Sequence, residues 1–137
     1  MRLDPVACWT RLGAVGHGVL GTVHPARGVD AVPVVYLVEG ASIVIPIDAV
    51  KPKSGRRLQR LANLDGDDRA VLLVEHYEDD WSQLWWVRLR GRAHVVERDD
   101  RALELLRAKY PQYRERPPRG PFILVDIGER VTWSADS

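Results

Sequence analysis

The feature that most constrains this chain is an alternation of side-chain types over residues 84–96, LWWVRLRGRAHVV. Successive side chains of a β-strand point to opposite faces, so a period of two predicts one long strand with two unlike faces. One face is expected to carry Trp85, Val87, Leu89, Gly91, Ala93 and Val95, and the other Trp86, Arg88, Arg90, Arg92 and His94. We expect Trp85 to lie in the core.

Six further segments are predicted to be strands: residues 19–24, 31–38, 42–47, 70–77, 122–128 and 130–134. The segments 31–38 and 42–47 are apolar on both faces, which predicts buried strands, yet each contains a proline, Pro33 or Pro46. Because proline cannot donate to a ladder, these two strands are expected to be edges, to be bulged, or to face a ligand or a partner subunit.

Three helices are predicted, over residues 3–12, 54–64 and 99–110. Asp4 is a candidate N-cap ahead of Pro5, Ser54 can cap the second helix, and Pro111 ends the third. Since the strands are mostly joined by short turns, the expected fold class is mainly β (α+β). The expected architecture is an antiparallel barrel of about six to seven strands with peripheral helices, in a single domain over residues 1–137.

The overall charge gives little support to a nucleic-acid coat, because the 137 residues have a formal net charge of only +1. Cys8 is the lone cysteine, so no internal disulfide is possible, which fits a reducing compartment. The apolar runs are too short to span a bilayer, and the first residues do not read as a signal peptide. We therefore expect a cytoplasmic protein.

The common catalytic and metal-binding motifs are missing from the sequence. The four histidines lie far apart and there is no second cysteine, so metal-ligand spacing is absent. The histidines are His17, His24, His76 and His94. Neither a G-x-S-x-G sequence nor a Walker or dinucleotide glycine fingerprint occurs. If the protein is an enzyme, its chemistry is expected to come from a cofactor that the chain binds and orients.

A basic segment, residues 51–60 (KPKSGRRLQR), concentrates cations in a nearly neutral chain. It contains Lys51, Lys53, Arg56, Arg57 and Arg60, with no acid between them. Arg57 and Arg60 lie one turn apart on the predicted helix, whose N-terminus also attracts anions. The segment predicts a site for a phosphate with carboxylates beyond it. Useful affinity would require a flat apolar group packing on the upstream strands.

The order of elements resembles the pyridoxamine 5'-phosphate oxidase-like, FMN-binding split β-barrel superfamily, over roughly residues 10–133. Within it, three segments look like the actinobacterial branch of coenzyme F420-dependent enzymes of the PPOX class: GTVHPARGVDAVPVV, KPKSGRRLQRLANL and HYEDDWSQLWWVRLRGRA. The third of these is the most specific.

The resemblance implies a homodimer with the cofactor, the deazaflavin coenzyme F420, in a groove at the subunit interface. Pro33, Val34 and Val35 would line the ring, with Thr22 nearby, and Asn63 would help to fix the helix. The phosphate and the oligoglutamate tail would be held by Lys51, Lys53, Arg57 and Arg60. The implied activity is an oxidoreductase that transfers a hydride between reduced deazaflavin and a small electron-poor organic substrate.

Several alternatives stay open at this point. Close relatives in the superfamily use FMN, and some members bind haem or biliverdin. An FMN-binding protein of this class, and a split barrel that stores or sequesters a cofactor or tetrapyrrole without catalysis, are therefore the alternatives. His76 and Tyr77 are weak candidates for a proton donor, and the catalytic residues are otherwise unassigned. A nucleic-acid-binding barrel would use the face with Trp86 and the arginines, but the acid-rich residues 65–80 and the small net charge argue against it. Exposed strand edges on their own also favour a dimer.

Overall fold

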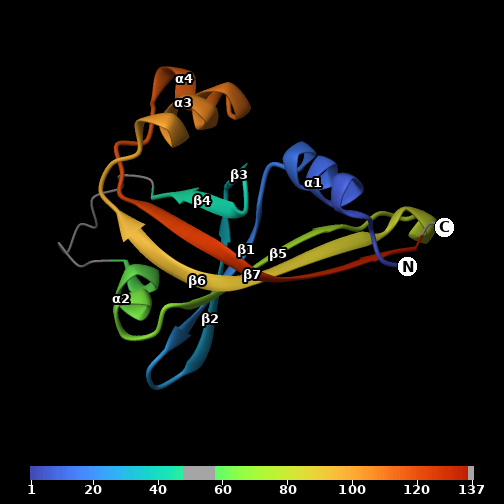
Figure 1. Cartoon of the computed structure of the whole chain (residues 1–137), viewed down its shortest axis with the longest axis horizontal. Coiled ribbons are helices and arrows are strands. Elements are labelled where there is room, and N and C mark those ends of the chain that lie inside the picture. Colours follow the sequence, from blue (N-terminus) through green and yellow to red (C-terminus); the bar gives the residue numbers. More distant parts are fainter. Residues whose placement is uncertain (48–57, 136–137) are drawn as a thin grey trace.

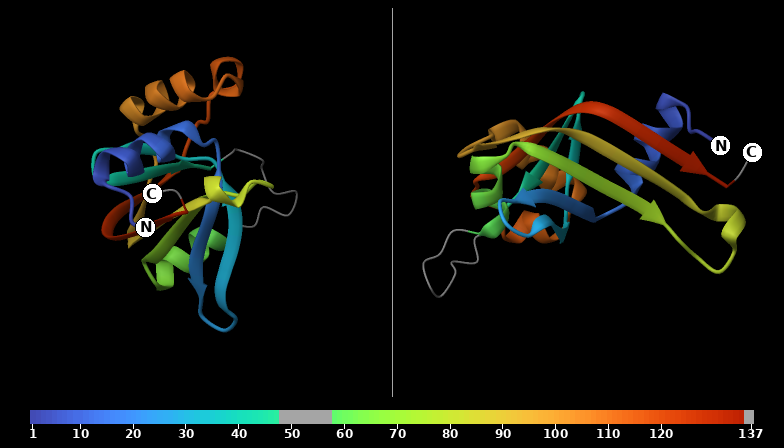
Figure 2. Two further views of the ribbon diagram at one scale, coloured as in Figure 1. Left: turned by 90° about the vertical axis from the view of Figure 1, so that its right-hand side faces the viewer. Right: turned by 90° about the horizontal axis from the view of Figure 1, so that it is seen from below.

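The computed structural model describes residues 1–47 and 58–135 and shows a curved, seven-stranded antiparallel sheet (Figures 1 and 2). The strands are β1 (Gly18–His24), β2 (Gly28–Val34), β3 (Leu37–Glu39), β4 (Ser42–Pro46), β5 (Arg69–His76), β6 (Trp85–Val96) and β7 (Phe122–Ser134). Their order in the sheet is β2-β1-β5-β6-β7-β4-β3. The helices are α1 (Pro5–Ala14), α2 (Gln59–Gly66), α3 (Asp100–Lys109) and α4 (Gln112–Glu115), and η1 (Trp81–Gln83) is a 3-10 turn. This architecture confirms the mainly-β, α+β split-barrel class.

The alternating segment forms β6, which pairs with β5 on one side and β7 on the other. Trp85, Val87 and Leu89 are buried, as the alternation predicts. The pairing of β6 with β7 shifts register between Arg90 and Gly91, and a side chain at position 91 would collide with the backbone of the facing strand. A bulge of this kind bends a strand, and here it lies in the middle of the curved part of the sheet.

Two predicted strand boundaries are wrong. Residues 31–38 form two strands, because the chain turns at Val35 and Tyr36 between β2 and β3. The backbone of Tyr36 bonds to side chains of the α3 end instead of a strand: its N–H donates to Tyr110 Oη at 3.1 Å, and its carbonyl accepts from Lys109 Nζ at 3.0 Å. The predicted interruption at Glu129 does not exist, since β7 continues through it while pairing with β6.

The prediction of an edge strand is confirmed for the strand with Pro33, but its predicted burial is wrong, because Val34 is the one buried residue of β2. β2 is an edge strand of the sheet, so Pro33 can pair with Val19 on one side without breaking a ladder on the other. β4 is neither an edge nor bulged, since it lies between β7 and β3 in regular register, so these two alternatives are wrong for Pro46. Pro46 is the last residue of β4 and pairs with Phe122 of β7, beyond the part of β4 that pairs with β3.

The predicted helix ends agree with the structure at the first and third helices. Asp4 Oδ1 accepts a hydrogen bond from Ala7 N at 2.8 Å, and Asp99 Oδ1 accepts one from Ala102 N at 3.0 Å. The predicted cap of the second helix, Ser54, lies outside the described residues. The short helix α4 is not among the three predicted helices, and it forms where Tyr113 packs into the cluster beneath α3.

The core lies in the concavity of the sheet, where α1 packs, and a second, smaller cluster lies beneath α3 and α4. The first cluster includes Leu12, Leu20, Leu72 and Leu89, and α2 adds Leu61 and Leu64 to it. The second contains Leu37, Val44, Ala102, Leu106, Tyr113 and Phe122. The N-terminus of the chain lies beside the end of β7, where the Met1 amino group donates to the Ser134 carbonyl at 2.9 Å (Figure 1). Among the described residues, no helix is long and apolar enough to cross a membrane.

Candidate functional site

The ends of β2 and β4 meet α2 and the α1–β1 connection around a pocket of about 210 Å³. We call it the Pro33–Arg60 pocket; its lining residues are His17, Pro33, Val34, Val35, Pro46 and Arg60. Four of these, Pro33, Val34, Val35 and Arg60, belong to the set that the resemblance assigns to the cofactor. An apolar wall and a guanidinium from separate elements therefore border one cavity.

The apolar wall is the last part of β2 and the corner that follows. Pro33 is exposed, Val35 is half-buried, and Val34 is 8% exposed. Val34 lies opposite Gly18 in the ladder, where any β-carbon would crowd the neighbouring strand β5. The tight approach of β1 to β5 thus fixes the place of β2 and of the wall that it carries.

Arg60 reaches the pocket from α2, and a buried hydrogen-bond network fixes that helix to the sheet. Asn63, 1% exposed, donates from Nδ2 to Thr22 Oγ1 on β1 and to Asp30 Oδ2 on β2, each at 2.9 Å. Its Oδ1 accepts a bond from Gln59 Nε2 at 2.9 Å. The bond from Asn63, followed by that from Arg27, lowers the pKa of Asp30, so the carboxylate stays charged in the network. Thr22 therefore supports the pocket from behind and does not line it.

The opposite wall is held by the C-terminal end of α3. Tyr110 Oη lies 2.9 Å from the Gly16 carbonyl and 2.8 Å from the Tyr36 carbonyl, and it accepts the Tyr36 N–H. Lys109 Nζ lies 4.0 Å from the centre of the Tyr36 ring, a cation–π distance. Gly16 and Tyr36 each adjoin a pocket residue, His17 or Val35. The pair Lys109–Tyr110 therefore joins two segments that border the pocket.

Of the remaining predicted site residues, the two that the structure describes, His76 and Tyr77, do not line this pocket. Lys51, Lys53 and Arg57 lie outside the described residues. His76 Nε2 bonds to the Glu78 carboxylate, and its ring stacks on Trp85 beside a different cavity. Tyr77 is 66% exposed near the tip of the β5–β6 hairpin.

His17, Pro46, Lys109 and Tyr110 were not among the predicted site residues. Pro46 had a signal in the sequence, since a ligand or partner facing its strand was one of the three alternatives for a proline in an apolar strand. His17 follows a glycine-rich stretch that reads as a helix stop. Lys109 and Tyr110 lie 73 and 74 residues from Tyr36 in the chain, and nothing local in the sequence indicates that contact.

The sheet face turned away from α1 carries a row of side chains that crosses five strands. In register, Pro33 lies opposite Val19, Val19 opposite Leu73, Leu73 opposite Arg88, and Arg88 opposite Val131. Val19 and Leu73 are each 38% exposed, and Arg88 Nε is buried without a hydrogen-bond partner among the residues that the structure describes. Since Pro33 belongs to both, the pocket lies at the margin of this face, which we call the outer sheet face.

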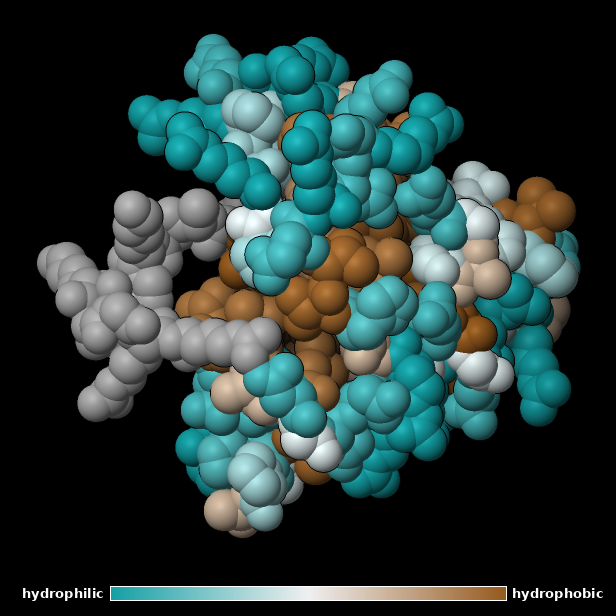
Figure 3. All heavy atoms as spheres, turned by 60° about the vertical axis from the view of Figure 1, so that its left-hand side comes forward, coloured by the Kyte–Doolittle hydropathy of each residue, from teal (hydrophilic) through white to brown (hydrophobic). Residues whose placement is uncertain are grey.

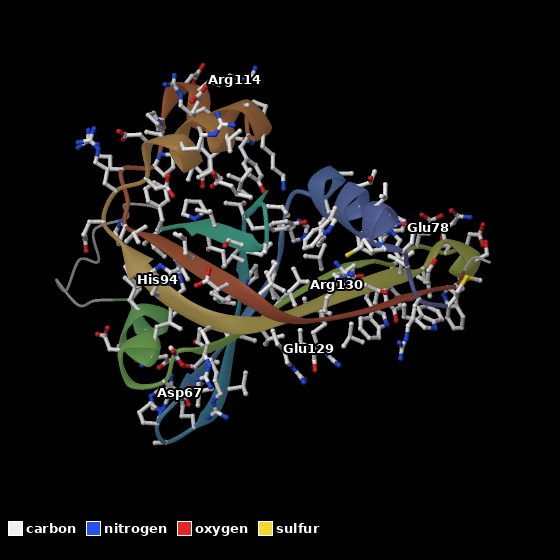
Figure 4. All side chains as sticks on the ribbon, in the orientation of Figure 1. Asp67, Glu78, His94, Arg114, Glu129 and Arg130 are labelled. Atoms are coloured by element: carbon white, nitrogen blue, oxygen red, sulfur yellow. The ribbon has the colours of Figure 1, made fainter. Side chains whose placement is uncertain are left out.

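Side chains on the two sides of β7 show which face of the sheet is turned toward α1 and which is the outer sheet face. Figure 4 shows Glu129 and Arg130 on opposite sides of the strand, with Arg130 toward α1. The Arg130 guanidinium lies over the Trp9 ring of α1, 5.5 Å from its centre, whereas Glu129 pairs with Arg90 at 3.5 Å on the outer sheet face. Apolar surface also gathers at mid-height between the hydrophilic α3–α4 pair and the opposite end of the molecule (Figure 3).

Comparison with known proteins gives a family and a fold. The model of the family described as pyridoxamine 5'-phosphate oxidase matches residues 4–122. A conserved hypothetical protein of Mycobacterium tuberculosis is similar in structure, with a TM-score of 0.77 at 18% identity over 97% of this chain and 86% of the other. A search of the curated proteins found no match.

Two solved structures of FAD-binding proteins are also similar. The protein from Mycobacterium smegmatis has a TM-score of 0.65 at 18% identity, over 97% of this chain and 96% of its own. The protein from Mesorhizobium loti has a TM-score of 0.71 at 14% identity, over 96% and 95%. At such identities the likeness establishes the shared fold.

Proposed function

This chain belongs to the pyridoxamine 5'-phosphate oxidase family, and from that premise we propose that it is an oxidoreductase with a flavin-type cofactor in the Pro33–Arg60 pocket. The observation that carries the proposal is the meeting of an apolar wall with a guanidinium in one cavity. A flavin-type cofactor joins a flat ring system to an anionic chain, and the two parts of the pocket match these two chemistries.

The described residues fit part of such a cofactor. Pro33, Val34 and Val35 offer an apolar surface to a ring, and Arg60 offers a charge-assisted hydrogen bond to a phosphate or carboxylate, worth about 1.5–3 kcal/mol. The cavity of about 210 Å³ is smaller than the roughly 300–1,000 Å³ of most small-molecule sites. The proposal therefore requires further groups to complete the site.

The basic segment is the first source of those groups. Residues 48–57 join Ile47, which follows the pocket residue Pro46, to Leu58, two residues before Arg60. We assign Lys51, Lys53 and Arg57 to the phosphate and the anionic tail on the basis of this connection and of their charge.

A second copy of the chain is the other source, and we propose a homodimer through the outer sheet face. The row from Pro33 to Val131 presents apolar side chains together with Arg88, whose Nε is buried without a hydrogen-bond partner in the described part of the chain. A partner subunit on this face would cover Val19 and Leu73 and enclose the pocket at its margin.

When bound and reduced, the cofactor supplies a hydride to an electron-poor acceptor. The role of the protein would be to bind and orient this cofactor. The β2 wall would exclude water from one side of the ring, Arg60 would hold the anionic portion, and Asn63 keeps α2 in place. His76 and Tyr77 do not border the pocket, so we assign neither of them the proton that accompanies the hydride.

We propose coenzyme F420 as the cofactor. The basic segment from Lys51 to Arg60 carries enough cations along its length to pair with both a phosphate and an oligoglutamate tail. FMN is the second candidate, since the likeness to two FAD-binding proteins favours a flavin and FMN is the simpler flavin nucleotide. A cytoplasmic location accords with the lone, buried Cys8.

Titration of the purified protein with coenzyme F420 and, in parallel, with FMN tests the proposal. Quenching of tryptophan fluorescence reports binding, since the chain has five tryptophans. Binding of the deazaflavin in preference to FMN supports the first candidate. Binding of FMN alone would support a flavin site and make FMN, not coenzyme F420, the cofactor. Binding of neither compound overturns the proposal.

A further inference from the structure

The middle of the outer sheet face holds a cation without a counter-charge. Arg88 of β6 lies in register between Leu73 of β5 and Val131 of β7, so both of its cross-strand neighbours are apolar. Its guanidinium carbon lies 5.5 Å from the centre of the Trp86 ring, and its Nε is buried without a hydrogen-bond partner in the described part of the chain. Buried polar groups in proteins are nearly always bonded, and a buried charge is costly without a partner. Arg88 therefore indicates a missing acceptor.

The same region carries a carboxylate that is also unpaired. Glu75 of β5 is exposed and forms no hydrogen bond or ion pair with the other residues that the structure describes. The two acids of β7 differ from it, since each bonds a neighbour: Glu129 to Arg90 at 3.5 Å, and Asp126 to Ser42 at 3.1 Å. Glu75 is thus the acid of the two flanking strands that is available to a cation.

Glu75 and Arg88 lie close together on the sheet but do not meet within one chain. Glu75 lies opposite Trp86, and Arg88 lies opposite Leu73, so the two charged residues occupy diagonal positions of the β5–β6 ladder. Diagonal positions are roughly 7–8 Å apart, within reach of long side chains. The guanidinium nevertheless lies over the Trp86 ring instead of at the carboxylate.

A second copy of the chain on this face can bring the two charges together. In an isologous interface the same surface faces itself across a two-fold axis, so every contact occurs twice. An axis that lies in the interface and crosses the strands turns each strand end for end. If this axis passes between the Leu73–Arg88 pair and the Glu75–Trp86 pair, the partner subunit's Glu75 lies over Leu73. Arg88 is then one strand away, a spacing of about 4.8 Å.

We propose that Arg88 forms an ion pair with the partner subunit's Glu75 across such an axis, twice in each dimer. The inference rests on the dimer of the proposed function and adds the orientation of the two faces and the residues that hold them. The pair gives the guanidinium a charge-assisted hydrogen bond, and the same approach covers Leu73, which is 38% exposed. Because apolar neighbours surround the contact, like charges at this place are strongly unfavourable.

Two charge-reversal variants, Arg88→Glu and Glu75→Arg, test the pair when they are studied apart and then mixed. Each variant alone has like charges at both contacts of its homodimer. We therefore expect its dimer dissociation constant to rise at least about a hundredfold, about tenfold for each contact. In a mixed dimer both contacts join opposite charges again. Native mass spectrometry of the equimolar mixture separates this heterodimer from the homodimers by mass, and we expect the heterodimer to predominate.

The mixture also distinguishes a pair between subunits from a pair within one chain. If Arg88 and Glu75 met inside each subunit, each variant would keep its like charges after mixing, and no heterodimer would be favoured. The control Arg101→Glu reverses an exposed arginine of α3 that is not part of the outer sheet face, and it should leave the homodimer intact. The milder variant Glu75→Gln keeps the size of the side chain and should raise the dissociation constant at least about tenfold.

The outcomes separate this inference from the proposed function. Homodimers that persist in both charge-reversal variants overturn the ion pair, and so do variants that dissociate but form no heterodimer on mixing. A dimeric original chain that binds its cofactor leaves the proposed function standing in both cases. If the heterodimer forms while neither coenzyme F420 nor FMN binds, the proposed function fails and the ion pair stands. A monomeric original chain overturns both the dimer and the pair.

Discussion

Asn63 of α2 and Thr22 of β1 form a hydrogen bond of 2.9 Å in the interior, between side chains that are 1% and 2% exposed. The same amide nitrogen bonds Asp30 on β2, so one side chain connects a helix to two strands. The helix carries Arg60 and β2 carries Pro33, so this connection sets the two sides of the pocket relative to each other.

Replacing Asn63 with alanine is expected to destabilise the protein by about 1–3 kcal/mol, because buried Thr22 and the Asp30 carboxylate lose their bonds to it. Urea unfolding measures the effect. The control Gln59→Ala removes only the bond to Asn63 Oδ1 from an exposed position, and we expect less than half the loss. Equal losses for the two variants would show that the network does not anchor α2.

Arg60→Gln should weaken cofactor binding by about 10- to 100-fold, the equivalent of one charge-assisted hydrogen bond of about 1.5–3 kcal/mol. The dependence of the affinity on salt should decrease as well, since one cation has been removed from the site. Fluorescence titration at two salt concentrations measures both effects, with Arg101→Gln as the matched control. An unchanged affinity removes Arg60 from the site.

Much of the fold could be predicted because its signals are local. The alternation of residues 84–96 defines β6, Asp4 and Pro5 define the start of α1, and Pro33 places β2 at an edge. The turn at Tyr36 could not be predicted in this way. The residues 31–38 look like one apolar strand, and the interruption comes from Lys109 and Tyr110, which bond the Tyr36 backbone from far along the chain.

The candidate site could be predicted only in part, again because only some of its residues have a local signal in the sequence. The apolar wall and Arg60 have local signals, in a proline within an apolar run and in a cluster of cations. The contribution of His17 depends on how the α1–β1 connection packs, which no spacing in the sequence reveals. The network of Asn63, Thr22 and Asp30 likewise depends on three elements meeting in space.

Tyr110→Phe tests whether the α3 end positions the pocket. The change keeps the ring but removes the hydroxyl that contacts Gly16 and Tyr36, so we expect a loss of about 1–3 kcal/mol in unfolding free energy. Cofactor affinity should fall severalfold, although Tyr110 is not a pocket residue. The control Tyr77→Phe removes the hydroxyl of an exposed tyrosine and should change neither quantity. A stability loss with unchanged affinity would limit Tyr110 to a structural role.

Lys109 should give the protein a pH-dependent stability, since burial lowers its pKa from 10.5 to about 8. Between these two values the unfolded chain holds a proton that the folded chain has released, so the free energy of unfolding rises with pH across this window. Burial also raises the pKa of Cys8, Tyr36 and Tyr110, and their effect has the opposite sign, above about pH 9 for the thiol and above about pH 10 for the two phenols. Measurements are therefore best confined to about pH 7–9.

In that range, Lys109→Met should abolish the rise and Arg101→Gln should preserve it, as measured by urea midpoints. Methionine retains an apolar stem of similar length, which separates the effect of the charge from that of packing. A variant with the same slope as the original chain would mean that another group titrates in this range.

The dimer proposal depends on the outer sheet face, and Val19→Glu tests it at a residue flanked in register by Pro33 and Leu73. A carboxylate buried between apolar neighbours loses its hydration without gaining a partner, so we expect the dimer dissociation constant to rise at least about tenfold. The matched control is Val6→Glu, the same substitution at an exposed position of α1 on the other side of the sheet.

Size-exclusion chromatography with light scattering at micromolar concentration measures the outcome. The original chain and Val6→Glu should both have twice the mass of the 15.5 kDa chain, and Val19→Glu should approach the mass of one. Cofactor affinity should fall in parallel with dissociation, because the proposal makes the partner subunit part of the site. If the original chain itself has a monomer mass, the outer sheet face is not a dimer interface. If Val19→Glu dissociates but still binds the cofactor normally, the pocket is complete within one subunit.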